Sequence, residues 1–135
     1  MQISNAEWQV MRVIWSQGES TSQEITQLLA EKLDWTASTV KTLLTRLVSK
    51  EYIVANKEER RFVYSPLVTE DESVQEICQD VSEKICTKKI PKVIHELIQT
   101  HELTEEDIQA LINQLKEKER VGQITCECIP GEHTC

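Results

Sequence analysis

The chain has 135 residues, with 15 lysines and arginines against 23 aspartates and glutamates, which gives a formal net charge of −8. Its apolar content of 39% and charged content of 28% are typical of a soluble globular protein, and its apolar runs are too short for a membrane helix. No secretory signal is visible at the start, so we expect a cytoplasmic protein without a membrane partner. An evenly spread negative charge would argue against binding nucleic acid, because phosphate contacts need Lys and Arg.

The charge is not evenly spread. Residues 1–68 hold eight basic and eight acidic side chains, whereas residues 69–135 carry the whole net charge of −8. Such a step in composition predicts a domain boundary near Pro66. We expect a first domain over residues 1–68, a helical region over 69–121 and a short tail over 122–135.

Capping-box patterns, in which a Ser or Thr precedes an acidic residue by three positions, predict helix starts in the first domain. Ser4–Glu7 begins one helix, which Gly18 ends, and Thr21–Glu24 begins a second. Thr36 can cap a third helix that runs to about Lys50. Apolar residues recur at helical spacing along this third helix; they are Val40, Leu43, Leu44, Leu47 and Val48.

A change of pattern follows the third helix. The runs 52–54 and 62–64 are β-branched and aromatic, and they flank the polar stretch 56–61, which predicts a β-hairpin with a charged tip. Three helices followed by a hairpin is the order of a winged helix-turn-helix. The predicted fold is therefore mainly α with a small β-hairpin.

The third helix has a small, polar outer face that suits the major groove of double-stranded DNA. From Thr36 to Arg61 the local net charge is +3. Candidate DNA-binding residues on the helix and at the hairpin tip are Ser38, Thr39, Lys41, Thr42, Thr45, Arg46, Lys57, Arg60 and Arg61. The pattern alone also fits a small helical domain with an ordinary solvated face. The three tryptophans, Trp8, Trp15 and Trp35, are expected in the core.

Several of these residues resemble the penicillinase-repressor (BlaI/MecI) family. The resemblance rests on Ser4, Trp8 and Trp15, on the turn 34–36, and on the run 38–47, and it extends to about residue 120. It implies a winged-helix homodimer that binds a palindromic operator and represses transcription. By the same resemblance, the recognition helix is the predicted third helix.

The acidic second half contains three further helical patterns. Their start signals are Thr69–Glu72, Pro91 and Thr104–Asp107, and Gly122 ends the helical pattern. Because three short helices make a thin core, we expect their apolar faces to form a dimer interface or partly an intrachain core. The candidates are Val74, Ile77, Val81, Val93, Leu97, Ile108, Leu111 and Leu115. Cys78 continues such a face, which predicts a buried thiol.

The tail holds three of the five cysteines in the pattern C-x-C-x4-H-x-C. Two ligand pairs, Cys126 with Cys128 and His133 with Cys135, flank a Pro-Gly turn. Three thiolates and one imidazole suit tetrahedral Zn(II), and thiolates equally select Cu(I). Redox-active cysteines or a chance cluster are the alternatives.

This tail resembles the C-x-C-x4-C-x-C motif of the copper-responsive (CopY-type) repressors within the same family. The resemblance implies that the zinc-loaded dimer holds its operator, that Cu(I) is the inducer, and that a copper chaperone donates it. His133 stands where that motif has a third cysteine. Because a neutral imidazole cannot bridge two Cu(I) ions, we expect fewer or weaker Cu(I) than with four cysteines.

Three other functions were considered. A β-lactam-responsive repressor inactivated by proteolysis would have no need of metal ligands. A metal-buffering protein would bind metal but no operator. An enzyme is not expected, because the chain has no nucleophile–base constellation and only three glycines.

Overall fold

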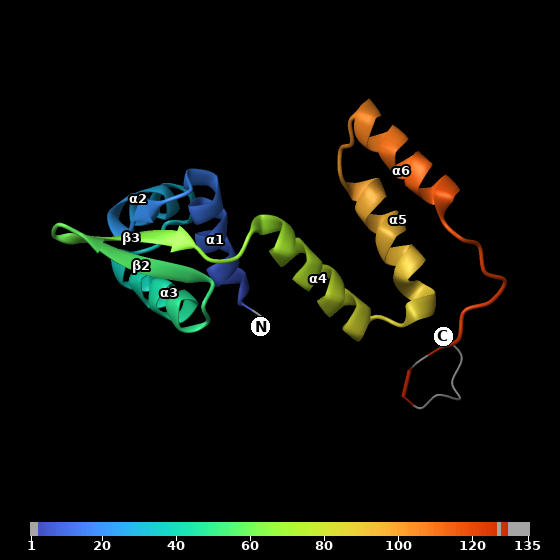
Figure 1. Cartoon of the computed structure of the whole chain (residues 1–135), viewed down its shortest axis with the longest axis horizontal. Helices are drawn as coiled ribbons and strands as arrows, with labels where there is room; N and C mark the ends of the chain where they lie inside the picture. The colour runs from blue at the N-terminus through green and yellow to red at the C-terminus, as the bar shows by residue number, and fades with distance from the viewer. Residues whose placement is uncertain (1–2, 127, 130–135) are drawn as a thin grey trace. The chain divides into compact units, whose positions relative to one another are not determined.

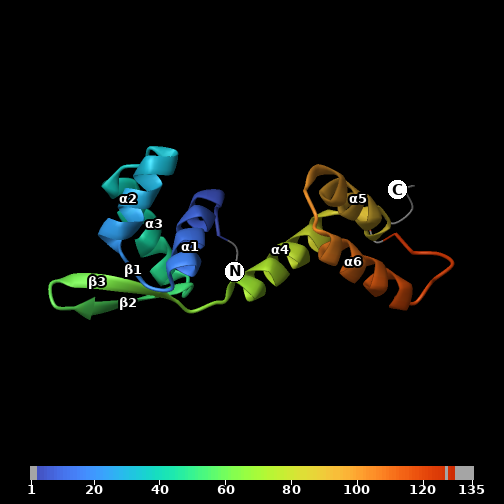
Figure 2. The same ribbon diagram turned by 90° about the horizontal axis from the view of Figure 1, so that it is seen from above.

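The computed structural model describes residues 3–126 and 128–129. The chain divides between Glu76 and Ile77 into two compact units, which are described separately below. The predicted class is confirmed: the described residues are mainly helical, with one small antiparallel sheet. Figures 1 and 2 show the elements in two views.

The first unit begins with three helices and one short strand. The elements are α1 (Asn5–Gln17), β1 (Ser20–Thr21), α2 (Ser22–Leu33) and α3 (Ala37–Ser49). Each helix starts where its cap predicts: the side chains of Ser4, Thr21 and Thr36 accept hydrogen bonds from backbone N–H groups three residues on. At Ser4 the full capping box with Glu7 is present. Gly18 ends α1 with φ 81°, a conformation that favours glycine.

The sheet contains one strand more than the sequence predicts. Strands β2 (Ile53–Glu58) and β3 (Arg61–Pro66) form the expected hairpin, and β1 adds to the other edge of β3. The predicted polar tip is also shorter than expected, because the strands pair up to Glu58 and Arg61 and leave only two residues in the loop. This tip projects beyond the helices in both views (Figures 1 and 2).

The core of the first unit joins the apolar faces of the three helices to the start of the hairpin. It contains Val10, Met11, Ile14, Ile25, Leu29, Val40, Leu43, Leu44, Leu47, Tyr52 and Ile53. Trp15 and Trp35 pack against this core, and the rings of Trp8 and Trp15 are 5.6 Å apart. The sequence predicts these tryptophans in the core. In the structure they are only partly buried.

Helix α4 (Glu70–Lys84) starts in the first unit and continues into the second. The second unit adds the short 3₁₀ helix η1 (Thr87–Lys89), α5 (Ile90–Thr100) and α6 (Glu105–Glu117). Thr104 and Asp107 form the predicted capping box at the start of α6. The predicted end at Gly122 is wrong, because Lys118 already has an extended backbone and α6 ends at Glu117.

Candidate nucleic-acid interface and cysteine cluster

Helix α3 separates an apolar face from a polar one. Val40, Leu43, Leu44 and Leu47 are buried in the core. All six candidate residues on this helix are exposed: Ser38, Thr39, Lys41, Thr42, Thr45 and Arg46. The helix therefore presents one continuous polar face to solvent, as the sequence pattern predicts.

The threonines on this face are partly engaged by their own helix. The Thr42 hydroxyl donates to the carbonyl of Ser38 at 3.0 Å, and the Thr45 hydroxyl donates to the carbonyl of Lys41 at 2.9 Å. Their protons are used within the helix, which leaves these two hydroxyls available as acceptors. Lys41 and Arg46 are the cationic donors on this face.

The hairpin supplies the remaining predicted cations. In the register of the hairpin, Lys57 of β2 lies opposite Phe62 and Arg61 of β3 lies opposite Glu58. Arg60 lies in the two-residue loop. All three basic side chains are exposed. Glu58 and Glu59 lie among them, so the wing is mixed in sign and not a purely basic patch.

A groove of about 670 Å³ lies beside the polar face of α3 and the hairpin. It lies between α2, α3 and β3, and Lys41 and Thr45 line it from α3. The sequence reasoning missed its other walls, which are Ser22, Gln23, Thr26 and Gln27 of α2, Ala37 of α3, and Phe62 and Tyr64 of β3. The polar residues on one face of α2 were the signal that could have found its four lining residues.

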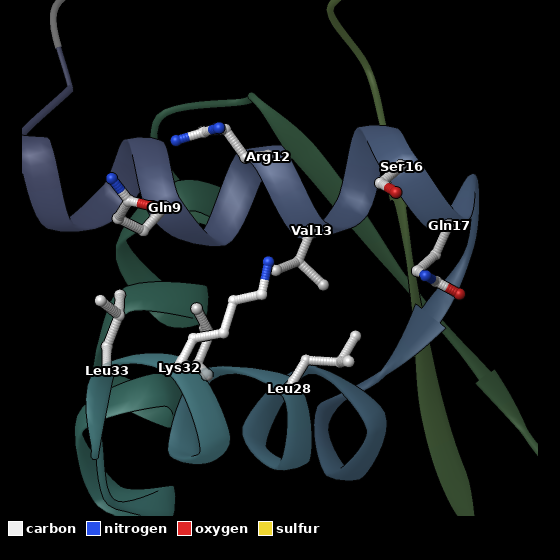
Figure 3. Close-up of a pocket in the computed structure, with 9 residues that line it drawn as sticks. Gln9, Arg12, Val13, Ser16, Gln17, Leu28, Lys32 and Leu33 are labelled. Atoms are coloured by element: carbon white, nitrogen blue, oxygen red, sulfur yellow. The ribbon is translucent and has the colours of Figure 1, made fainter.

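A second, smaller pocket of about 380 Å³ lies between α1 and α2 (Figure 3). In the close-up the Lys32 side chain extends from α2 toward Val13 of α1, with Leu28 beside it. None of the predicted DNA-binding residues lines this pocket. It is therefore distinct from the polar face of α3.

Within the first unit, two long-range contacts hold the segment that leads into α4 and the first half of α4. The indole Nε1 of Trp15 donates to the carbonyl of Val68 at 3.0 Å, and the Tyr52 hydroxyl donates to the carboxylate of Glu76. Burial, with the nearby Glu76 carboxylate, raises the pKa of Tyr52 well above its usual value, so the phenol stays protonated. Because Tyr52 lies three residues after the end of α3, it links the end of α3 to α4.

The tail cysteines have a partner that the sequence reasoning missed. The sulfur atoms of Cys86, Cys126 and Cys128 all lie within 4.8 Å of one another. The Cys86 and Cys126 sulfurs are 3.6 Å apart, and the backbone N–H of Cys128 donates to the Cys126 sulfur at 3.4 Å. His133 and Cys135 lie outside the described residues.

The predicted burial of Cys78 is wrong for the single chain. Its thiol is exposed. The predicted interface residues are likewise exposed or half-buried, and α5 and α6 bury none of their side chains. Within the described residues, no helix is both long and apolar enough to cross a bilayer.

Comparison with known proteins places these features in context. Residues 3–117 match the family model described as the penicillinase repressor. A Latilactobacillus sakei protein, described as an uncharacterized 16.5 kDa protein in the ptsI 3′ region, is 36% identical over 99% of this chain and 93% of its own length.

Two solved structures match about half of this chain. The DNA-binding domain of the repressor BlaI has 38% sequence identity and a TM-score of 0.50, over 53% of this chain and 87% of that one. A structure described as a CopR repressor has 53% identity and a TM-score of 0.44, over 50% of this chain and 99% of that one.

Proposed function

The chain belongs to the penicillinase repressor family, and from this premise we propose that it is a metal-responsive repressor whose homodimer binds a palindromic operator. Repression of transcription through DNA binding follows from the family and from the likeness to the BlaI DNA-binding domain. The response to metal, the assembly and the choice of residues are the proposed part.

The proposed DNA contacts come from α3 and the wing. Six exposed polar residues of α3 lie opposite its buried stripe, which is the arrangement of a recognition helix in the major groove. Lys57, Arg60 and Arg61 on the hairpin reach the flanking phosphates. Residues 69–135 carry the acidic excess of the chain and are assigned no DNA contact.

The proposed dimer uses the apolar faces of the second unit. Leu97 and Ile98 of α5, and Leu111 and Ile112 of α6, are between 36% and 56% exposed in the single chain. Large apolar side chains grouped on helices in this way are stabilised when a second copy covers them. A palindromic operator requires the same two-fold pairing.

One observation carries the proposed metal response: the Cys126 and Cys128 sulfurs lie within 4.8 Å of each other and of the Cys86 sulfur. Thiolate sulfur is a ligand for both Zn(II) and Cu(I). We assign Cys126, Cys128, His133 and Cys135 as the tail ligands, of which the first two lie among the described residues. When bound, zinc supplies a fixed cross-link for the tail, whereas Cu(I) favours fewer, softer ligands.

The switch follows from differential affinity. An inducer releases DNA only if it binds the DNA-free state more tightly than the DNA-bound state. The tail and the apolar helices belong to the same unit, so a change in how the tail is held alters the helices of the proposed dimer. We propose that the zinc-loaded protein keeps the operator and the Cu(I)-loaded protein leaves it, so that the controlled genes serve copper homeostasis.

The test is operator binding by gel shift on an inverted-repeat promoter fragment, with zinc, with Cu(I) and with no metal. We expect a shift with zinc that Cu(I) abolishes. Cys126→Ser should lose the response to Cu(I), whereas Cys78→Ser, a change of the same kind on α4, should keep it.

The other outcomes separate the competing functions. Absence of a specific shift under every condition would overturn the repressor and leave a metal-buffering protein. A shift that ignores Cu(I) would remove the copper response and favour a β-lactam-responsive repressor inactivated by proteolysis.

A further inference from the structure

Cys86 lies far from the tail in sequence but next to it in the structure. It occupies the junction between α4 and α5 as the residue before η1, and it is half-buried. The segment after α6 returns toward the start of α5 in both views (Figures 1 and 2). Cys126 lies 40 positions after Cys86 in the chain, and this return brings its sulfur to 3.6 Å from the Cys86 sulfur.

The spacing of the three sulfurs suits a shared metal ion. Four zinc–sulfur bonds of about 2.3 Å in tetrahedral directions separate the ligand sulfurs by roughly 3.8 Å. The distance of 3.6 Å between Cys86 and Cys126 is close to this value, and the whole cluster falls within 4.8 Å. The donor set therefore fits the metal without a large movement of the backbone.

We propose that Cys86 is a thiolate ligand of the metal site, together with Cys126 and Cys128. This inference rests on the proposed metal response and adds a ligand from outside the tail. It also changes the expected chemistry, because Cys86 supplies a thiolate in a chain whose tail has His133 in place of a cysteine. The site then resembles a four-thiolate site more closely than the tail alone does.

A ligand at position 86 gives the metal a structural role that the tail alone lacks. The chain between Cys86 and Cys126 contains η1, α5 and α6. A metal that holds both ends closes this segment into a loop and restricts how its helices are arranged. Because these helices carry the proposed dimer faces, metal exchange at the site acts directly on dimer geometry.

The test measures each cysteine separately in the reduced full-length protein, by its rate of alkylation followed by mass spectrometry. With zinc added, we expect the rate at Cys86 to fall by about tenfold or more, together with the rates at Cys126 and Cys128. The rate at Cys78, the exposed cysteine of α4 outside the proposed ligand set, should fall much less than the rate at Cys86.

Metal affinity provides a second readout that does not depend on DNA. Cys86→Ser should weaken zinc binding by about tenfold or more, since even the loss of an outer-shell partner has an effect of this size. Cys78→Ser is the matched control and should leave zinc affinity unchanged. Circular dichroism of both variants checks that the helices are retained.

The two proposals fail in different ways. If zinc protects Cys126 and Cys128 but leaves the Cys86 rate and the Cys86→Ser affinity unchanged, this inference is overturned and the tail remains a metal site. If neither zinc nor Cu(I) protects any cysteine, the metal response fails as well, and only operator binding is left to the proposed function.

Discussion

The Lys50 ammonium lies 2.9 Å from both carboxylate oxygens of Glu7, and this pair joins the end of α3 to the first turn of α1. The Glu7 side chain is only 3% exposed, and the Lys50 side chain is 30% exposed. A buried carboxylate that loses its cation leaves an uncompensated charge or an unpaired polar group. The pair therefore helps to hold the end of α3 against α1.

The pKa of Glu7 reflects both burial and pairing. Burial, the largest influence, would raise this pKa, but the hydrogen bonds from Lys50 and Ser4 and the charge of Lys50 outweigh it and lower the pKa below 4.5. Because the pKa is lower in the folded state than in the unfolded state, the stabilisation is complete above about pH 4.5 and is lost as the pH falls through the folded-state pKa.

We therefore expect Glu7→Gln to lower the free energy of unfolding by about 2 kcal/mol at pH 7, less than for a fully buried pair because Lys50 is partly exposed. The difference from the unmodified protein should shrink toward pH 3. Urea denaturation at the two pH values measures it, with the exposed Glu31 changed to Gln as the control. An equal difference at both pH values would count against this role of the pair.

The end of α3 predicts a stabilising substitution. Tyr52 N–H donates to the carbonyl of Leu47 at 3.0 Å and Glu51 N–H donates to the carbonyl of Val48 at 3.1 Å, which is a Schellman motif with Glu51 in the left-handed position at φ 62°. Glycine is favoured at that position because it has no Cβ.

Glu51→Gly should therefore raise the free energy of unfolding by about 0.5–1 kcal/mol, since relief of left-handed strain is partly offset by a more flexible unfolded chain. Glu51→Ala removes the same charge and keeps the strain, so it should show no such gain. Thermal or urea unfolding of both variants decides the point; equal stabilisation by both would assign the effect to charge.

Variants that each lose one positive charge should differ in operator affinity according to where that charge lies in the first unit. Lys41→Ala on α3 should weaken operator binding by about 1–3 kcal/mol. Arg60→Ala in the hairpin loop should weaken all sequences alike and reduce the salt slope by about 1. Fluorescence anisotropy at several salt concentrations measures both effects.

Lys32→Ala is the matched control for these variants. It removes one positive charge at the pocket between α1 and α2 (Figure 3), which none of the candidate residues of α3 lines. Its affinity should stay close to that of the unmodified protein. A loss as large as that of Lys41→Ala would show that only the net charge of the first unit matters.

The proposed dimer predicts a concentration-dependent effect. Leu97 of α5 is 56% exposed in the single chain. Leu97→Asp should destabilise the proposed dimer, because the dimer would bury the carboxylate without a partner. Sedimentation should then show a monomer, and operator affinity should fall because the half-sites are no longer bound together. Val121→Asp, at a residue 67% exposed beyond the helices, should remain dimeric; an unaltered dimer with Leu97→Asp would place the interface elsewhere.

Local features of this chain could be predicted from the sequence because their causes lie within a few residues. Ser4 with Glu7 and Thr104 with Asp107 form the predicted capping boxes, and Thr36 caps α3 as expected. A side chain that bonds a backbone N–H three residues away leaves its full signature in the sequence. The winged-helix order and the exposure of the nine candidate DNA-binding residues follow from such signals combined with hydrophobic periodicity.

Features that join distant residues depended on the tertiary structure. The strand β1 contains only Ser20 and Thr21, and nothing in so short a segment predicts its pairing with Val63 and Tyr64. The exposure of Cys78 depends on which helix faces meet another element, and periodicity marks a face as apolar without saying what covers it.

The sequence by itself therefore determined the helix starts and the wing, because hydrogen-bonding and periodic patterns act at short range. Only the tertiary structure decided that Lys50 neutralises Glu7, that Tyr52 bonds Glu76, and that Cys86 joins Cys126 and Cys128. These contacts form between residues 24 to 43 positions apart in the chain, where proximity is set by the packing of whole elements.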